Sequence, residues 1–111
     1  MNRGEVWLVS FGEPSGPEQA GIRPAIVLQN DLLGPYVETS IVIPLTTKTK
    51  RLSIPTTVYI PAGEAGLSED SVALCHQVQV RGKVRFLSLY GILSRPFLVE
   101  VQNALLNALD L

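Results

Sequence analysis

Residues 16–28 read GPEQAGIRPAIVL, which changes from a loop rich in glycine and proline to an apolar strand. Pro24 biases the residue before it, Arg23, toward an extended backbone. The apolar residues that follow, 25–28, are typical of a strand buried on both faces. The loop therefore leads to one arginine at the rim of a rigid element. A cation held there by the fold is well placed to bind an anion such as phosphate.

The chain around this stretch is punctuated like an all-β module that ends in a helix. Glycine, proline and asparagine clusters separate short β-branched and apolar runs. Pro44 indicates that part of the third run lies at an edge or a bulge. The expected strands are 5–11, 23–29, 39–45, 56–60, 71–80 and 87–93.

The C-terminal segment has a helical period instead. From Ser94 or Arg95 through Leu109 the apolar residues follow helical spacing, with Leu98, Val101 and Leu105 on the face expected to be core. Ser94 can cap the start, and Pro96 suits the first turn. We therefore expect a mainly β (α+β) fold, a small and strongly curved sheet or barrel with this helix packed across it.

Length and composition predict one domain spanning residues 1–111. A hydrophobic fraction of 46% argues against disorder, and no apolar run approaches the ~20 residues of a membrane helix. The N-terminus leads directly into a strand pattern, so we expect no signal peptide. A single cysteine, Cys75, excludes an internal disulfide and suits a reducing cytoplasm.

The charge is unevenly distributed. The net charge is −1, less basic than is usual for a protein that binds nucleic acid without sequence preference. Between Glu38 and Glu64, however, there is no acidic residue, and Lys48, Lys50 and Arg51 fall together there. This basic loop predicts a local positive patch that attracts a polyanion to one face.

Several catalytic routes are disfavoured by the residue inventory. The chain has one histidine and one cysteine, too few for the usual metal-ligand patterns, so we expect no metal. On the expected strand Cys75 and His76 point to opposite faces, which makes them a poor nucleophile and base. The glycine loop lacks the lysine and the following helix of a nucleotide-binding loop, so no cofactor is expected.

The chemistry that remains is phosphoester transesterification within RNA. The 2′-hydroxyl is already tethered beside its phosphorus atom, so the substrate supplies the nucleophile. Arg23 suits the task because its planar fork donates two hydrogen bonds to phosphate oxygens and keeps its charge. Thr46, at the end of the third strand, could donate its hydroxyl to a second phosphate oxygen.

Each of these residues also has a purely structural interpretation. Arg23 could be a solvated surface residue and Thr46 an ordinary strand end. The cations of the basic loop could only protect an edge strand from aggregation. His76 could be a partly buried strand residue.

Five blocks of the sequence closely resemble the MazF/PemK toxins of bacterial toxin-antitoxin systems. The Glu-Gln-x-Gly-x-Arg-Pro block within 18–30 is the most specific of them. The others are 3–7, 43–46, 69–74 and Gln77, so the likeness covers most of the chain.

The resemblance implies an SH3-like barrel with a C-terminal helix, the fold of the CcdB and PemK plasmid toxins, assembled as a homodimer. It also implies metal-independent, sequence-specific cleavage of single-stranded RNA that leaves a 2′,3′-cyclic phosphate and a 5′-hydroxyl. It further implies a cognate antitoxin whose acidic C-terminal segment occupies the RNA groove.

The resemblance also implies roles for particular residues. Arg23 and Thr46 would be catalytic, with Glu18 as one candidate to accept the 2′-hydroxyl proton and Arg23 itself as another. The RNA-binding residues would be Gln19, Lys48, Lys50, Arg51, His76 and Gln77. Two other functions stay open at this point, a non-catalytic toxin that binds DNA gyrase, like CcdB, and an RNA-binding barrel without turnover.

Overall fold

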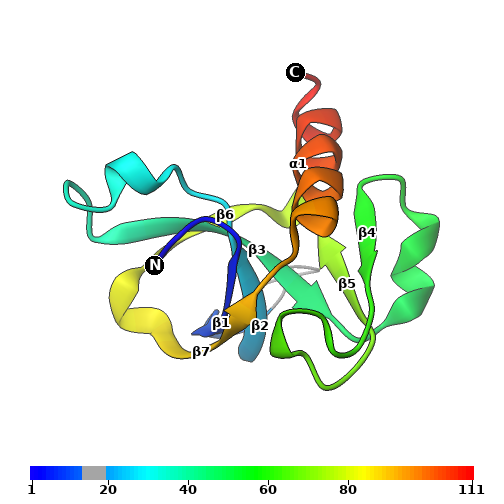
Figure 1. Cartoon of the computed structure of the whole chain (residues 1–111), viewed down its shortest axis with the longest axis horizontal. Coiled ribbons are helices and arrows are strands. Elements are labelled where there is room, and N and C mark those ends of the chain that lie inside the picture. Colours follow the sequence, from blue (N-terminus) through cyan, green and yellow to red (C-terminus); the bar gives the residue numbers. More distant parts are fainter. Residues whose placement is uncertain (14–19) are drawn as a thin grey trace.

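Seven antiparallel strands and one helix make up the part of the chain that the computed structural model describes, residues 1–13 and 20–111, with only the backbone of residue 51 (Figure 1). The strands are β1 (Glu5–Ser10), β2 (Ile22–Val27), β3 (Thr39–Thr46), β4 (Thr57–Ile60), β5 (Ser71–Leu74), β6 (Gln79–Gly82) and β7 (Phe86–Ile92), and the helix is α1 (Arg95–Leu109). Short 3₁₀ turns are η1 (Asp31–Leu33), η2 (Thr49–Ser53), η3 (Glu64–Gly66), η4 (Cys75–Gln77) and η5 (Lys83–Arg85).

The strand order is β4-β5-β3-β2-β1-β7, and β6 pairs with β3 beside this path. The predicted mainly β fold with a C-terminal helix is confirmed, and the predicted helix bounds agree with α1. The word barrel is too strong, because the strands of the described residues form an open sheet in which β6 and β7 do not pair.

The predicted strand 71–80 is wrong as one continuous element. On β3, Leu45 lies opposite Ala73. An uninterrupted ladder would then set residue 76 opposite Val42, but Gln79 lies there, three residues further along the chain. That shift is the length of η4, so η4 is an insertion that leaves the ladder between β5 and β6. Both ends of the predicted segment do form strands, β5 and β6. The sequence pattern cannot reveal which residues between them lose their pairing with β3. Cys75 and His76 consequently lie in a turn and not on a strand.

Pro44 lies beside this interruption. On one edge β3 pairs with β2, with Pro44 opposite Ala25. On the other edge its partner changes from β6, last paired at Val42, to β5, first paired at Leu45. A proline is tolerated there because it has no N–H to leave unpaired where the ladder is broken.

The sheet carries an apolar cluster on each face. Ile26, Ile43 and Leu45 face α1, where Val101 is fully buried against them in the larger cluster. We call this side the helix face. The residues that alternate with them form the second cluster on the opposite side; they are Val9, Phe11, Ala25, Val27 and Val42, with Trp7 and Phe86 packed against them.

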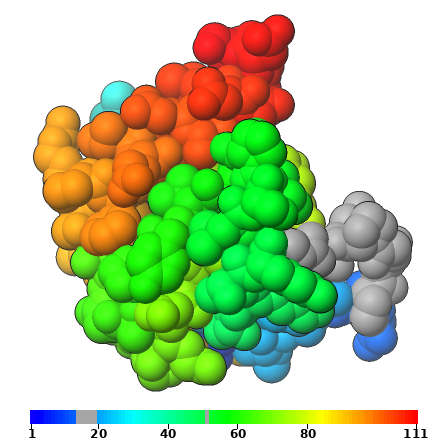
Figure 2. All heavy atoms as spheres, turned by 90° about the vertical axis from the view of Figure 1, so that its right-hand side faces the viewer, coloured from blue at the N-terminus to red at the C-terminus, as the bar shows by residue number. Residues whose placement is uncertain are grey.

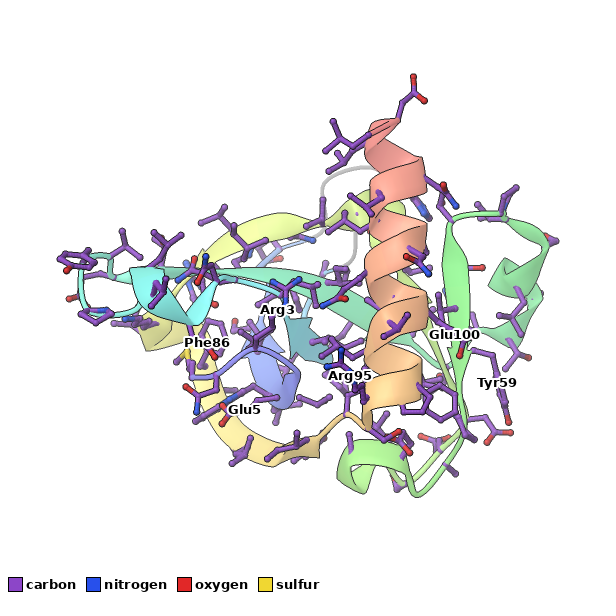
Figure 3. All side chains as sticks on the ribbon, turned by 45° about the horizontal axis from the view of Figure 1, so that its top comes forward. Arg3, Glu5, Tyr59, Phe86, Arg95 and Glu100 are labelled. Carbon is purple, nitrogen blue, oxygen red and sulfur yellow. The ribbon has the colours of Figure 1, made fainter. Side chains whose placement is uncertain are left out.

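The helix is tied to the sheet by Arg3 as well as by apolar packing. Its guanidinium donates to the carbonyl of Leu28 at the end of β2. With the amide of Gln102 turned so that its oxygen faces Arg3, that oxygen accepts from Nε at 3.0 Å and from Nη2 at 2.9 Å. Figure 3 shows Arg3 between the start of β1 and α1. Arg3 therefore links the N-terminal turn, β2 and α1.

The start of α1 differs from expectation in one detail. Ser94 occupies the N-cap position, but its side chain makes no capping hydrogen bond. Its backbone N–H instead donates to Glu64 Oε1 at 2.6 Å, which joins the helix start to η3. Figure 2 looks onto the green segment that holds η2 and β4, with α1 above it. No helix among the described residues is long and apolar enough to cross a membrane.

Candidate functional site

Arg23 and Thr46 come together through the pairing of β2 with β3. The ladder between β2 and β3 ends with Ala25 opposite Pro44. Continued by two residues, the same antiparallel register places Arg23 opposite Thr46. Residues directly opposite in such a pair share a face of the sheet. Arg23 also pairs with Val9 of β1, on the side away from α1. We call this side the Arg23 face.

A pocket confirms that the two strand ends are close in space. Ile22 and Pro24, on either side of Arg23, line it together with Thr47, the neighbour of Thr46. Its volume is about 180 Å³. Figure 2 shows the same proximity from outside, with the start of β2 (light blue) next to the segment around η2 (green). Because side chains alternate along a strand, Arg23 and Thr46 project from the face of the sheet opposite this pocket.

The arginine is held by the loop that precedes its strand. Arg23 is half-buried, and its Nε donates to the carbonyl of Ala20 at 2.8 Å. Pro24 keeps the backbone extended, and at this position β2 pairs only with β1, so the proline interrupts no ladder on its other edge. The Nε bond uses one of the five N–H donors of the guanidinium. The four on the terminal nitrogens have the fork geometry that binds phosphate.

The threonine is fixed more rigidly than the arginine. Thr46 is only 3% exposed, and its backbone pairs with Val72 of β5. Its Oγ1 accepts from the backbone N–H of Lys48 at 3.3 Å, so the first residue of the basic loop bends back toward the strand end. Since Oγ1 acts there as an acceptor, its own proton stays available for donation.

The basic loop lies on the same side of the sheet. Lys48 and Lys50 are exposed, and η2 packs against β4 and β5. Val72 and Leu74, on the face of β5 that Thr46 shares, are fully buried, which indicates that η2 covers this face. The side chain of Arg51 lies outside the described residues.

The two polar residues of η4 lie outside the strand ladder, in a turn that packs against β3, β4 and α1. His76 is exposed, and its Nδ1 is 3.0 Å from Thr56 Oγ1, just before β4. Gln77 is half-buried, in the turn and not on a strand as predicted. The neighbouring thiol faces the opposite way, because Cys75 is fully buried and packs on the α1 side. Burial raises its pKa to about 12, which makes it a poor nucleophile.

One residue of the Arg23 face was missed by sequence reasoning. Arg81 lies on β6 opposite Ser40, and its Cζ is 5.3 Å from the centre of the Phe11 ring. The alternation of Gln79 and Arg81 in the segment QVRG was the available signal. That alternation could not show which strand pairs with this segment or which ring Arg81 contacts.

Two predicted residues, Glu18 and Gln19, lie outside the described residues. Within residues 1–13 and 20–111 no three histidine, cysteine, aspartate or glutamate side chains gather where they could hold a metal ion. The candidate site among the described residues therefore consists of one arginine, one buried hydroxyl and a cationic loop, while His76 and Gln77 lie on the separate turn η4.

Comparison with known proteins identifies the family. Residues 2–109 match the family model of PemK-like, MazF-like toxins of type II toxin-antitoxin systems. The chain belongs to the PemK/MazF toxin family. The resemblance found in its sequence motifs is thus confirmed over almost the whole chain.

Individual members of the PemK/MazF family support the assignment. The endoribonuclease MazF of Staphylococcus epidermidis is 36% identical over 105 residues, which cover 95% of this chain and 88% of that protein. The crystal structure of MazF from Deinococcus radiodurans superposes with a TM-score of 0.85 at 24% identity, covering 100% of this chain and 97% of that one. A mycobacterial endoribonuclease in complex with its cognate antitoxin superposes with a TM-score of 0.81 at 21% identity, covering 98% and 94%. The last two likenesses concern the fold alone.

Proposed function

We propose that this protein is a metal-independent, sequence-specific endoribonuclease toxin that cleaves single-stranded RNA. The single observation that supports the proposal is the register of β2 on β3, because its extension by two residues beyond Ala25 and Pro44 sets Arg23 opposite Thr46 on one face of the sheet, where Lys48 of the cationic loop bonds to Thr46. The 36% identical relative from Staphylococcus epidermidis is an endoribonuclease, which supports the same activity here.

In the proposed reaction the 2′-hydroxyl attacks the adjacent phosphorus atom, and the bond to the 5′-oxygen of the next nucleotide breaks. The products are a 2′,3′-cyclic phosphate and a 5′-oxyanion, which takes a proton from water to become the 5′-hydroxyl. The terminal nitrogens of Arg23 donate to the phosphate oxygens, on which charge develops in the transition state. The hydroxyl of Thr46 donates a hydrogen bond to another phosphate oxygen from a position fixed by β3. Glu18 is proposed to accept the 2′-hydroxyl proton.

The RNA itself would be held by the residues around these two. Lys48 and Lys50 are exposed at the end of β3 and supply sequence-independent attraction to phosphates; Arg51 is proposed to add to it. His76 and Gln77, on the projecting turn η4, and Gln19 are proposed to contact the substrate as well. The shapes of the loops around these residues determine which unpaired bases can be accommodated.

The test is cleavage of a long mixed-sequence RNA in the presence of a chelator, with both product ends mapped. The parent protein should cut at a defined motif and leave 5′-hydroxyl ends. Arg23→Ala should lower kcat/KM by roughly 10²–10³-fold, as the loss of a transition-state donor does. Arg23→Lys should recover little, because a point charge lacks the planar fork. Arg95→Ala, at the exposed start of α1, is the matched control and should remain active.

The gyrase-binding alternative is not supported by the relatives reported above. It also predicts that toxicity survives Arg23→Ala and depends on the C-terminal helix. Full RNA cleavage by the Arg23→Ala protein would contradict the nuclease mechanism directly. RNA binding without any product would favour the RNA-binding barrel without turnover.

We propose two protein partners for the same chain. The first is a cognate antitoxin with an acidic C-terminal segment, supported by the complex of the mycobacterial endoribonuclease with its own antitoxin. The exposed lysines of the basic loop are suited to such a segment by charge. We place both proteins in the bacterial cytoplasm.

The second partner is another copy of the chain. In the described residues β7 pairs only with β1, so its outer edge is open. This edge and the turn before it expose a row of large apolar side chains, Val84, Leu87, Leu89, Tyr90 and Ile92. Such a row favours an interface over solvent. Light scattering should give the mass of a homodimer, and Leu89→Glu should shift it toward the monomer.

A further inference from the structure

Phe11 belongs to the apolar cluster of the Arg23 face, and the guanidinium of Arg81 lies over its ring. Phe11 follows Val9 by two residues and therefore points to the same side of the sheet. Val9 pairs with Arg23, and the N–H of Phe11 donates to Gly21 at 2.8 Å, so the β1–β2 ladder continues past the end of β1. Diagonal neighbours of this kind are about 7–8 Å apart. Arg81 approaches Phe11 from β6, with its Cζ 5.3 Å from the ring centre.

The ring holds the second guanidinium in place without consuming its donors. Phe11 is only 6% exposed, so the ring is a fixed part of the apolar cluster. A guanidinium over an aromatic face is attracted to it by the ring quadrupole. Arg81 also donates from Nη1 to the carbonyl of Val80 at 2.7 Å. The other N–H groups at the guanidinium edge keep their capacity to donate.

Among residues 1–13 and 20–111, no carboxylate forms an ion pair with the positive charge of Arg81. The side chain is half-exposed, and on β3 it faces Ser40, which is neutral. A cation of this kind, fixed by an aromatic ring beside a phosphate-binding arginine, has the properties of a second anion subsite.

We propose that Arg81 binds an RNA phosphate next to the scissile one held by Arg23. This inference rests on the proposed nuclease function and assigns a residue of β6 to its substrate track. The contact would be independent of base identity, because the buried Phe11 offers no free face for a base to stack on. Regularly spaced phosphates of an extended single strand can reach both guanidiniums on one face.

The experiment measures binding and cleavage separately. The motif is first mapped with the parent protein, and an oligonucleotide of that sequence is then made with 2′-deoxyribose at the cleavage point, so that it binds but cannot react. Dissociation constants are measured at several salt concentrations for the parent protein and for Arg81→Gln, Arg81→Lys and Arg95→Gln. Arg95 lies at the start of α1 (Figure 3), away from the Arg23 face. Its variant removes the same charge elsewhere.

Arg81→Gln should weaken binding about tenfold, the size of one lost charge-assisted hydrogen bond. It should also reduce the slope of log K against log salt by about 0.7, the value for one single-strand phosphate contact. Arg81→Lys should keep the slope, and Arg95→Gln should keep both quantities. Phe11→Leu, which removes the ring but keeps the charge, should keep the slope while weakening binding less than Arg81→Gln does.

The failures of the two proposals are distinguishable. A parent protein that cuts RNA while Arg81→Gln binds with unchanged affinity and slope overturns this inference alone. The same holds if Arg81→Gln lowers the affinity for an acidic peptide but not for the oligonucleotide. A parent protein that neither cuts nor binds RNA overturns the proposed function and this inference with it. Thermal unfolding of each variant separates a loss of binding from a loss of folding.

Discussion

Arg23 and Thr46 are held by different means, and each means suits the role proposed for the residue. Arg23 is half-buried and anchored through one nitrogen, so its fork can adjust to a bound phosphate. Thr46 is almost fully buried and accepts a backbone hydrogen bond, so its hydroxyl has one fixed position. One group is adjustable and the other is rigid.

The role of Thr46 as a hydroxyl donor predicts opposite outcomes for two near-isosteric substitutions. Thr46→Val removes the hydroxyl at constant shape and should lower kcat by roughly 10²–10³-fold, while Thr46→Ser should keep most of the activity. The valine variant also leaves the Lys48 N–H without its acceptor, at a cost of about 1 kcal/mol. RNA cleavage assays together with urea unfolding check this prediction. A fully active Thr46→Val protein would exclude Thr46 from the chemistry.

Cys75 predicts a loss of stability in alkaline solution. Burial raises its pKa from 9.0 to about 12 in the folded protein, whereas the unfolded chain keeps the ordinary value. Above that ordinary value the unfolded state releases a proton that the folded state keeps. The free energy of unfolding should therefore decrease as pH rises toward about 12, by at most about 1.4 kcal/mol per pH unit from this group, and be unaffected by it at lower pH.

The measurement is urea unfolding at several pH values between about 8 and about 10, for the parent protein and for Cys75→Ala. Lysine and tyrosine side chains titrate in the same range in both proteins. The difference between the two slopes therefore isolates the thiol. Equal slopes would contradict the prediction.

Among the elements, α1 contributes to stability through a small number of buried positions. Val101 is fully buried against the sheet, whereas Leu106 is 45% exposed on the same helix. Val101→Ala should lower the free energy of unfolding by about 2 kcal/mol, because it removes buried methyl groups and leaves a cavity. Leu106→Ala should change it by less than about 0.5 kcal/mol. Urea unfolding of both variants gives the comparison, and equal losses would mean that the helix does not pack as described.

The second feature at this scale is the segment β5–η4–β6, in which a 3₁₀ turn interrupts the strand pairing. One edge of β3 pairs with β5 and with β6, and the three residues between these registers project as η4. The projection separates the buried Cys75 from the exposed His76. A continuous strand would have kept His76 within the plane of the sheet, so the insertion accounts for its exposure.

At the scale of the whole molecule, we propose that residues 1–111 form one cooperative domain. The two apolar clusters share the strands β1, β2 and β3, so neither can be lost without exposing the other. The only tryptophan, Trp7, packs against the cluster of the Arg23 face, and α1 packs against the other cluster. Tryptophan fluorescence and far-ultraviolet circular dichroism therefore report on opposite sides of the sheet.

The two signals should give coincident unfolding curves in urea, as expected for a two-state transition. The physical reason is that both clusters are built on β1, β2 and β3, so the loss of one cluster disrupts the strands that support the other. Two separated midpoints would show that the helix side and the Arg23 side unfold independently, and would contradict the single-domain proposal.

The sequence by itself determined the local elements of this protein. The apolar run after Pro24 predicted a buried strand, and the helical period predicted a helix from Ser94 or Arg95 through Leu109, which agrees with α1. Arg23 could be predicted at the rim of a strand because the signals for that position are its sequence neighbours: a loop before it, and a proline and an apolar run after it. Local backbone preferences and hydrophobic periodicity act over a few residues, so one sequence is sufficient to reveal them.

Only the tertiary structure decided how these elements meet. It paired β2 with β3 in the register that brings the Arg23 end of one strand toward the Thr46 end of the other, broke the predicted strand 71–80 at η4, and brought Arg81 to Phe11 from a distant part of the chain. Strand register and ring contacts join residues that are far apart in sequence, and they are set by the packing of the whole sheet. No local preference encodes them, which explains why a sequence that revealed the arginine did not reveal its surroundings.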